Sequence, residues 1–210
     1  MSTHLRTHCL LLLLLMPLLV FGQREKKDPA NYVVFGLGAP SHSNDSDRYT
    51  YMFENHFADI GTATDLTFDW AEIGLRVTEG YHVNKYLALE GGLFFLDKSS
   101  ILANITTTDG TSAQEKFEVK QWGYDLYALG KYPIRPWLTL TGKLGGAYWW
   151  SNTERLVTGE KRDKASARLL IGAGLHSAIN DRLLVKLDWS KSDIDNVDFS
   201  MITIGLGVNY

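Results

Sequence analysis

The sequence contains a single cysteine, Cys9, which lies in an apolar stretch near the N-terminus. Disulfides and thiol chemistry are therefore excluded for the rest of the chain. Lysine and arginine number 21 against 24 aspartates and glutamates, so no positive excess indicates a nucleic-acid partner. Beyond residue 22, no apolar run approaches the ~20 residues of a membrane-spanning helix, so any membrane crossing must use strands.

The first 22 residues have the pattern of a secretory signal. A charged start precedes an apolar run over residues 9–21, and Gly22 then offers a small residue for cleavage. This run is short for a spanning helix, although a retained membrane anchor is the alternative. We expect a signal peptide over residues 1–22 and one domain over residues 23–210. Removal of Arg6 with the signal takes the formal charge from −3 to −4.

The C-terminal residues alternate with a period of two. From Ile202 to Tyr210 every second side chain is large and apolar, and those between are glycine, threonine or asparagine. This pattern predicts a strand with one apolar and one polar face. It recurs in seven earlier segments. The predicted strands cover residues 32–39, 68–80, 86–96, 117–132, 137–150, 165–178, 183–190 and 199–210.

The connections between these strands alternate in length. Short connections cover residues 82–85, 133–136 and 179–182, and long ones cover residues 40–67, 97–116, 151–164 and 191–198. Short turns on one side and long loops on the other are typical of outer-membrane barrels, in which the long side is extracellular. An even strand number places both termini on the periplasmic side. Eight strands close into a barrel that side chains fill.

Aromatic side chains gather at both ends of the predicted strands. They are Tyr81 and Tyr132 beside the short turns, and Trp122, Tyr148, Trp150 and Trp189 near the long loops. Between Tyr132 and Trp122, about ten residues at ~3.3 Å each and a tilt of about 40° give a rise of ~25 Å, the height of an apolar band between aromatic girdles. A soluble β-barrel, the alternative, has no reason for two such rings. We predict an all-β fold, an eight-stranded antiparallel up-and-down transmembrane β-barrel.

The opposite face of the predicted strands carries ionisable residues that we expect in the barrel lumen. They are Glu72, Arg76, Glu90, Asp125, Lys143, His176, Lys186 and Asp188. Four acids against three bases and a histidine nearly compensate, as a poorly hydrated interior requires, because an unpaired buried charge costs several kcal/mol. One interpretation is a structural plug of salt bridges. The other is a gate, in which partner exchange among Glu90, Lys143 and Lys186 opens a narrow ion path.

No arrangement of residues predicts catalysis, a cofactor or a metal site. His176 and Ser177 are neighbours on a strand and point to opposite faces, so they cannot share a proton. The glycine-rich segments lack the strand-turn-helix context of a phosphate-binding loop. One interpretation of the cations in the predicted loop 151–164 is a basic rim that neutralises lipopolysaccharide phosphates, and the alternative is a solvated loop. These cations are Arg155, Lys161, Arg162 and Lys164.

Several segments resemble the eight-stranded transmembrane domain of outer membrane protein A and the wider family of small porin-like outer-membrane barrels. They are GYHVNKYLALEGGL (80–93), LGKYPIRPWLTLTGKLGGAYWW (129–150), GAGLHSAINDRLLVKLDW (172–189) and ITIGLGVNY (202–210). The resemblance implies a monomer in the outer membrane of the Gram-negative cell envelope, with structural and surface-interaction roles. It also implies contact with outer-membrane lipid and lipopolysaccharide. Many members continue into a peptidoglycan-binding domain, whereas this sequence ends at Tyr210, so no cell-wall tether is expected.

In this family the outer-membrane assembly machinery reads a terminal strand that ends in an aromatic residue. The matching residues here are Tyr210, Val208 and Leu206. By the same resemblance, ionisable lumen residues are expected at Glu90, Lys143, His176 and Lys186. An alternative for Tyr210 is that it only belongs to an aromatic girdle.

Overall fold

The computed structural model describes residues 31–42, 61–69, 71–106, 110–194 and 197–210, and the predicted signal peptide lies outside these ranges. Ten strands make up the described part. They are β1 (Asn31–His42), β2 (Thr62–Asp69), β3 (Gly74–Asn84), β4 (Leu87–Leu96), β5 (Ser99–Thr106), β6 (Ser112–Arg135), β7 (Leu138–Arg155), β8 (Glu160–Ala178), β9 (Leu183–Ile194) and β10 (Val197–Asn209). Within these ranges no helix is long and apolar enough to cross a membrane.

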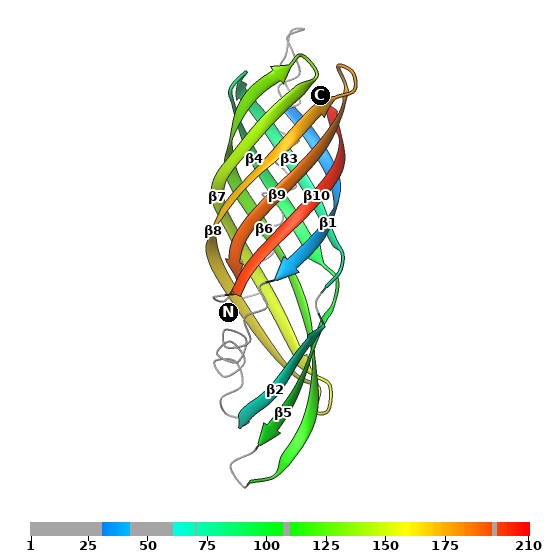
Figure 1. The fold of residues 1–210 in the computed structure, drawn as a ribbon, viewed down its shortest axis with the longest axis vertical. Helices are drawn as coiled ribbons and strands as arrows, with labels where there is room; N and C mark the ends of the chain where they lie inside the picture. The colour runs from blue at the N-terminus through cyan, green and yellow to red at the C-terminus, as the bar shows by residue number, and fades with distance from the viewer. Residues whose placement is uncertain (1–30, 43–60, 70, 107–109, 195–196) are drawn as a thin grey trace, which may run out of the picture.

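Eight of the strands form a closed antiparallel ring (Figure 1). Its order is β1, β3, β4, β6, β7, β8, β9 and β10, and the ring closes where β10 pairs with β1. Closure pairs each ring strand on both sides, so the ring has no open edge. The predicted fold class, an eight-stranded antiparallel barrel, is confirmed.

The remaining strands, β2 and β5, lie outside the ring and extend one end of it. β5 pairs with residues 112–119 of β6, β2 pairs with β5, and the β7–β8 hairpin continues alongside. We call residues 62–69, 99–106, 112–121, 151–155 and 160–164 the extension. In Figure 1 it projects at the bottom, away from the C-terminus. The tight turns at residues 85–86, 136–137 and 179–182 lie at the opposite end of the ring.

Two details of the predicted strands are wrong. Residues 68–80 are not one strand, because the chain leaves β5 as its partner and takes up β1 and β4 instead. At this change the Ala71 amide donates to the Ser99 hydroxyl at 2.9 Å, and the Asp97 amide donates to the Ile73 carbonyl at 3.0 Å. The long loops are also largely strand, since β5, β7, β8 and β9 occupy most of three of them.

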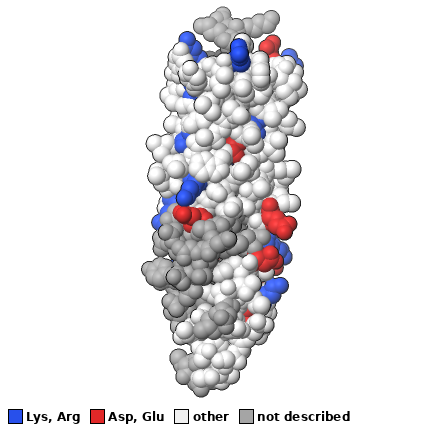
Figure 2. All heavy atoms as spheres, viewed as in Figure 1, with Lys and Arg blue, Asp and Glu red and all other residues white. Residues whose placement is uncertain are grey.

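The barrel wall and its interior differ in composition. Large apolar side chains such as Leu126, Leu144, Ile204 and Leu206 are well exposed on the wall. Figure 2 shows a mostly uncharged surface there, with charged residues gathered toward the ends of the ring and on the extension. Inside, a buried cluster that includes Phe94, Tyr127 and Trp149 fills the ring, while the extension has a separate core. The extension core comprises Ala63, Ile101, Ala103, Ile105, Phe117 and Val119.

Candidate functional site: the charged lumen

Glu90 is the centre of the polar network in the barrel lumen. It lies on β4 and is only 1% exposed. Lys186 of β9 approaches it with Nζ 2.6 Å from Oε1. The hydroxyls of Tyr32 on β1 and Tyr127 on β6 both donate to the same carboxylate. Four strands therefore converge on one buried charge, which is fully hydrogen-bonded as burial requires.

Asp188 connects Lys143 and His176 to this centre through Lys186. Its carboxylate lies 3.2 Å from Lys186 Nζ and 3.3 Å from Lys143 Nζ. His176 Nε2 lies 3.9 Å from the same carboxylate. Lys186 therefore bridges Glu90 and Asp188, and the four charges form one connected group in which every cation has a carboxylate within 4 Å.

Arg76 of β3 and Asp125 of β6 form a separate ion pair beside this group. With it, three carboxylates pair with three fixed cations, and all six residues are at most 6% exposed. These six charges balance when His176 is neutral. Because a buried unpaired charge is costly, this pairing lowers the cost of keeping the six charges away from bulk water. Arg168 of β8 also faces inward, opposite Ala147, and its Nε is buried without a protein partner among the described residues.

Glu72 does not belong to this set, so its predicted place in the lumen is wrong. It lies in the segment between β2 and β3, where the strand pattern is interrupted, and its side chain is exposed. Without Glu72, the predicted lumen residues comprise three acids and three fixed bases, where the sequence predicted one more acid than fixed bases. The other seven predicted lumen residues all lie on the inward faces of ring strands.

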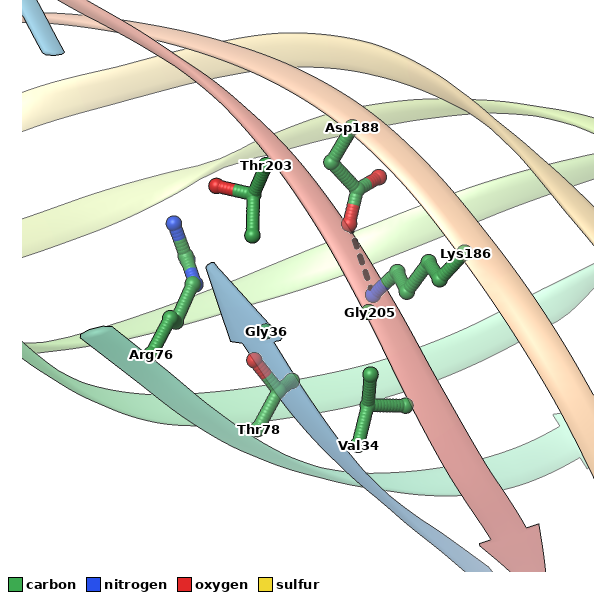
Figure 3. Close-up of a pocket in the computed structure, with 8 residues that line it drawn as sticks. All are labelled: Val34, Gly36, Arg76, Thr78, Lys186, Asp188, Thr203 and Gly205. Atoms are coloured by element: carbon green, nitrogen blue, oxygen red, sulfur yellow. Dashed lines mark ion pairs between the residues drawn. The ribbon is translucent and has the colours of Figure 1, made fainter. Parts of the chain in front are cut away.

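A cavity of about 10 Å³ lies within the network. Figure 3 shows the side chains of Arg76, Lys186, Asp188 and Thr203 around it, from β3, β9 and β10, with Gly36 of β1 on another side. A cavity of this size is at the lower limit of what admits one water molecule. The buried polar atoms around the cavity, such as Thr203 Oγ1 and Arg76 Nε, lack a protein partner, so a water there would have groups to bind.

An aromatic plug closes the lumen on the side of the extension. The rings of Phe94 and Trp149 lie 4.1 Å apart, and Trp149 meets Phe199 edge-on at 4.8 Å. All three side chains are at most 3% exposed. Inward glycines make room for such rings: a Cβ at Gly123 would approach Phe94 Cε2 to 3.0 Å. Charges and rings together fill the ring interior.

The sequence analysis missed the plug and the two tyrosines that bind Glu90. The signal was present, because Phe94 has the same strand parity as Glu90, Tyr127 the same as Asp125, and Trp149 the same as Lys143. A search for charged residues alone does not find these uncharged side chains of the inward face. Tyr32 carried less signal, because β1 has few polar residues to mark its inward side.

The predicted girdle residues lie on the outer wall. Trp122 and Trp150 stack across β6 and β7 with ring centroids 4.3 Å apart and an interplanar angle of 11°. Tyr148 meets Trp150 edge-on at 4.4 Å. The remaining three, Tyr81, Tyr132 and Trp189, are each more than a third exposed. The wall thus carries aromatics near both ends of the ring.

Tyr210 lies at the seam where the ring closes. Its amide donates to the Asn31 carbonyl at 2.9 Å, and the Asn31 amide donates back to the Tyr210 carbonyl at 3.3 Å. The Tyr210 hydroxyl also donates to Glu79 Oε1 of β3 at 2.8 Å. Val208 and Leu206 pair with β1 and β9 and face outward. The last residue therefore ties β10 to β1 and β3.

The four cations expected to form a basic rim do not share a face. Arg155 points inward in the extension and binds Glu115, whose hydrogen bonds raise the pKa of the guanidinium above its ordinary value. Arg162 pairs with Glu160 at 2.7 Å and Lys161 with Glu154 at 3.3 Å. Strand parity separates Lys161, which faces outward, from Arg162 and Lys164. Glutamates thus neutralise part of the expected rim.

Comparisons with known proteins agree with this architecture. The sequence profile of the outer membrane protein β-barrel domain family matches residues 9–210. No curated protein matches the chain.

Among solved structures, the chain is similar to Ail, the attachment invasion locus protein of Yersinia pestis, at 13% identity and a TM-score of 0.53, covering 88% of this chain and all of that one. OprG from Pseudomonas aeruginosa shares 14% identity with a TM-score of 0.53, covering 87% of this chain and 97% of that one. The N-terminal barrel of Pseudomonas aeruginosa OprF shares 11% identity with a TM-score of 0.52, covering 88% and 100%. At these identities the likeness shows the fold alone.

Proposed function

The chain belongs to the outer membrane protein β-barrel domain family and is an outer-membrane β-barrel protein; from this premise we propose that it serves as a structural and surface-interacting component of the envelope. In this proposal it is not an enzyme and requires no cofactor or metal. The observation that carries the proposal is the filled lumen, in which three carboxylates pair with three cations beneath an aromatic plug. Such an interior holds the barrel together and leaves the surfaces for contact.

The extension is the surface that we assign to contact with other molecules. It carries its own apolar core, so it holds a defined shape beyond the ring. Charged residues such as Lys116, Lys120 and Lys161 cover its outside. Ail, which has a similar fold, is named the attachment invasion locus protein. In our proposal the extension is extracellular, both ends of the barrel domain are periplasmic, and the barrel is a monomer.

Two partners follow from this placement. Outer-membrane lipid, including lipopolysaccharide, surrounds the apolar wall. The assembly machinery recognises β10 through Tyr210, Val208 and Leu206, which are outward-facing or at the ring seam. Neither partner requires the lumen, and nucleic acid has no place in the proposal.

Single-cysteine labelling on intact cells tests this orientation. Val157 lies in the β7–β8 turn and is 71% exposed, and Lys85 lies in a tight turn at the other end of the ring. A membrane-impermeant maleimide should label Val157→Cys on intact cells, and Lys85→Cys only after the outer membrane is permeabilised. The unmodified chain, with Cys9 alone, is the background control. The reverse labelling pattern would contradict the proposed role of the extension.

A second candidate is a narrow channel whose lumen salt bridges act as a gate. The cavity beside Arg76, Lys186 and Asp188 favours it, because it gives the network some room to rearrange. Lys186 already contacts both Glu90 and Asp188, so a small movement would exchange its partner. If this function holds, planar-bilayer recordings will show stepwise currents that Lys186→Ala or Glu90→Ala alters. Currents unchanged by both substitutions would exclude gating by this network.

A further inference from the structure

Three polar atoms near the junction of ring and extension are buried without a hydrogen-bond partner among the described residues. They are Gln121 Oε1 on β6, Trp149 Nε1 on β7 and Arg168 Nε on β8. Most other buried atoms of this kind belong to the ion-paired network or line its cavity. Buried polar groups are normally hydrogen-bonded, so three such atoms on adjacent strands require an explanation.

The strand register brings these three side chains around two serines. Gln121 is paired with Ser151, and Trp149 is paired with Ser166. Arg168 is the next inward residue after Ser166 on β8. Trp149 is therefore the diagonal neighbour of both Gln121 and Arg168, and such neighbours lie ~7–8 Å apart, within reach of long side chains. Both serines are small and partly exposed, so the three polar groups surround a place that a small molecule can reach.

This place carries a positive charge. In the described ranges Arg168 forms no ion pair, and Lys164, paired with Ser151, faces inward beside it. Every described inward acid on β6, β7 and β8 already binds another arginine. These pairs are Asp125 with Arg76, Glu115 with Arg155 and Glu160 with Arg162. On the outer face of the same rows, Glu154 binds Lys161 and Asp163 binds Asn152. The guanidinium of Arg168 therefore favours an anion from outside the chain.

The three polar groups also limit which anion fits. The Arg168 guanidinium and the Trp149 indole only donate hydrogen bonds, whereas the Gln121 carbonyl oxygen only accepts them. A ligand that satisfies all three must both accept and donate. Inorganic phosphate does so near neutral pH, because it keeps a hydroxyl group and its other oxygens match the fork of an arginine. Sulfate and chloride have no hydrogen to donate.

We propose that this site binds phosphate from the surrounding water. Phosphate oxygens accept from the Arg168 guanidinium and the Trp149 indole, and the phosphate hydroxyl donates to the Gln121 oxygen, with Ser151 and Ser166 beside it. The side chains face the inside of the sheet and not the apolar wall, so a soluble phosphate reaches them and a bilayer lipid does not. The site requires neither an open channel nor a particular orientation of the barrel.

The test follows the indole N–H signals of the purified full-length protein by nitrogen–proton NMR in a phosphate-free, non-denaturing detergent. Sodium phosphate is titrated at constant ionic strength near neutral pH, and the spectrum of Trp149→Phe identifies the Trp149 signal. That signal should shift and then saturate. The indoles of Trp122 and Trp150 lie on the outer wall and serve as internal controls, so their signals should not move.

Two substitutions and a matched control assign the contacts. Arg168→Gln should weaken phosphate binding about tenfold, because charge-assisted hydrogen bonds are lost. Arg182→Gln makes the same change at an exposed arginine in a turn at the other end of the ring, and its affinity should stay within about twofold of the original. Gln121→Leu removes the acceptor and should bring the affinities for phosphate and sulfate together. The dispersion of the NMR signals shows whether each variant is folded.

A Trp149 signal that phosphate leaves unchanged would overturn the site. Equal affinity for sulfate in the unmodified protein, or binding that Arg168→Gln does not weaken, would also overturn it. If Arg168→Gln fails to fold, the arginine has a structural partner and the proposal is wrong. Glycerol phosphate distinguishes two sources of the ligand, and either result supports the site: equal affinity assigns the terminal phosphate of a soluble ester, and weaker binding assigns the free ion.

Discussion

The barrel ring and the extension share strands β6, β7 and β8, yet the polarity of their two faces is opposite. On the ring part of β6, Leu126 faces outward and Asp125 inward; on the extension part, Lys116 and Lys120 face outward and Phe117 inward. The strand parity is continuous between the two parts, so each face of the sheet keeps its direction. The polarity of both faces reverses near Trp122. Only a change of surroundings explains this, because water favours charges and hydrocarbon favours leucine.

The two cores differ for the same reason. The extension is surrounded by water and is stabilised by burying Ile101, Ile105 and Phe117. The ring gains no free energy by burying its leucines, because hydrocarbon already surrounds its outer wall. Its lumen therefore holds ion pairs and aromatic rings instead. Glu90, Lys186 and the residues around them are therefore the part of the fold most sensitive to substitution, since any unpaired charge there has no water to replace its partner.

The largest effect is expected when the seam that closes the ring is disturbed. Deleting Tyr210 removes the backbone pairing with Asn31 and the proposed recognition signal. We expect the amount of protein in the outer membrane to fall by at least about an order of magnitude, with the remainder degraded, whereas Tyr210→Phe should insert normally because it keeps the aromatic ring. Fractionation and immunoblotting measure both. Normal insertion of the deletion variant would refute the assembly role.

Next in size is the loss of one lumen charge. Glu90→Ala leaves Asp188 as the single carboxylate in contact with Lys186. It also removes the hydrogen-bond acceptor of the Tyr32 and Tyr127 hydroxyls. The free energy of unfolding should fall by about 3–5 kcal/mol, as for a broken buried pair. Urea unfolding in lipid vesicles measures this. Glu90→Ala combined with Lys186→Met should recover part of the loss, and a single substitution costing under about 1 kcal/mol would show that water already fills the lumen.

A smaller effect distinguishes the two outer surfaces directly. Leu126→Lys places a charge on the ring wall and should lower the free energy of unfolding in vesicles by about 2–4 kcal/mol. Lys116→Leu, on the same face of the same strand but in the extension, should change it by under about 0.5 kcal/mol. The contrast between ring and extension would be wrong if both substitutions had the same small effect.

The smallest effect is expected for ion pairs outside the ring. Glu118 is bound by Lys98 and Lys120 on the exposed surface of the extension. Glu118→Gln should change the free energy of unfolding by no more than about 1 kcal/mol, and less as salt is added, because water screens such pairs. A cost equal to that of Glu90→Ala would mean that the extension surface is as dry as the lumen.

The sequence was sufficient to predict the ring because its strands have unlike faces. Ile202, Ile204 and Leu206 alternate with small or polar residues, and this alternation fixes both strand and orientation. The same parity placed Glu90, Lys143 and Lys186 on the inward side, where the structure has them. Which carboxylate pairs with which lysine depends on register and side-chain reach across the lumen, which a single sequence does not contain.

Most of the extension was predicted as loops, because its alternation of apolar and polar residues is weaker than that of the ring. The alternation in β5 is imperfect, because Ser99 lies on its buried face and Leu102 on the other face, and such a pattern also fits a surface loop. Across residues 68–80 the large apolar side chains change parity, from Phe68 and Trp70 to Ile73 and Leu75, but the prediction continued one strand across this break. Glu72 was misplaced for that reason, since parity has meaning only while a strand continues.

Single-channel recording of the purified protein in planar bilayers tests most directly whether the lumen is closed. The paired charges and the Phe94–Trp149–Phe199 plug fill the ring, so we predict no stepwise ion current from the unmodified barrel. Recordings of Glu90→Ala in the same membrane test whether loosening the network opens a path. Sustained conductance steps from the unmodified protein would contradict a closed lumen and favour the channel.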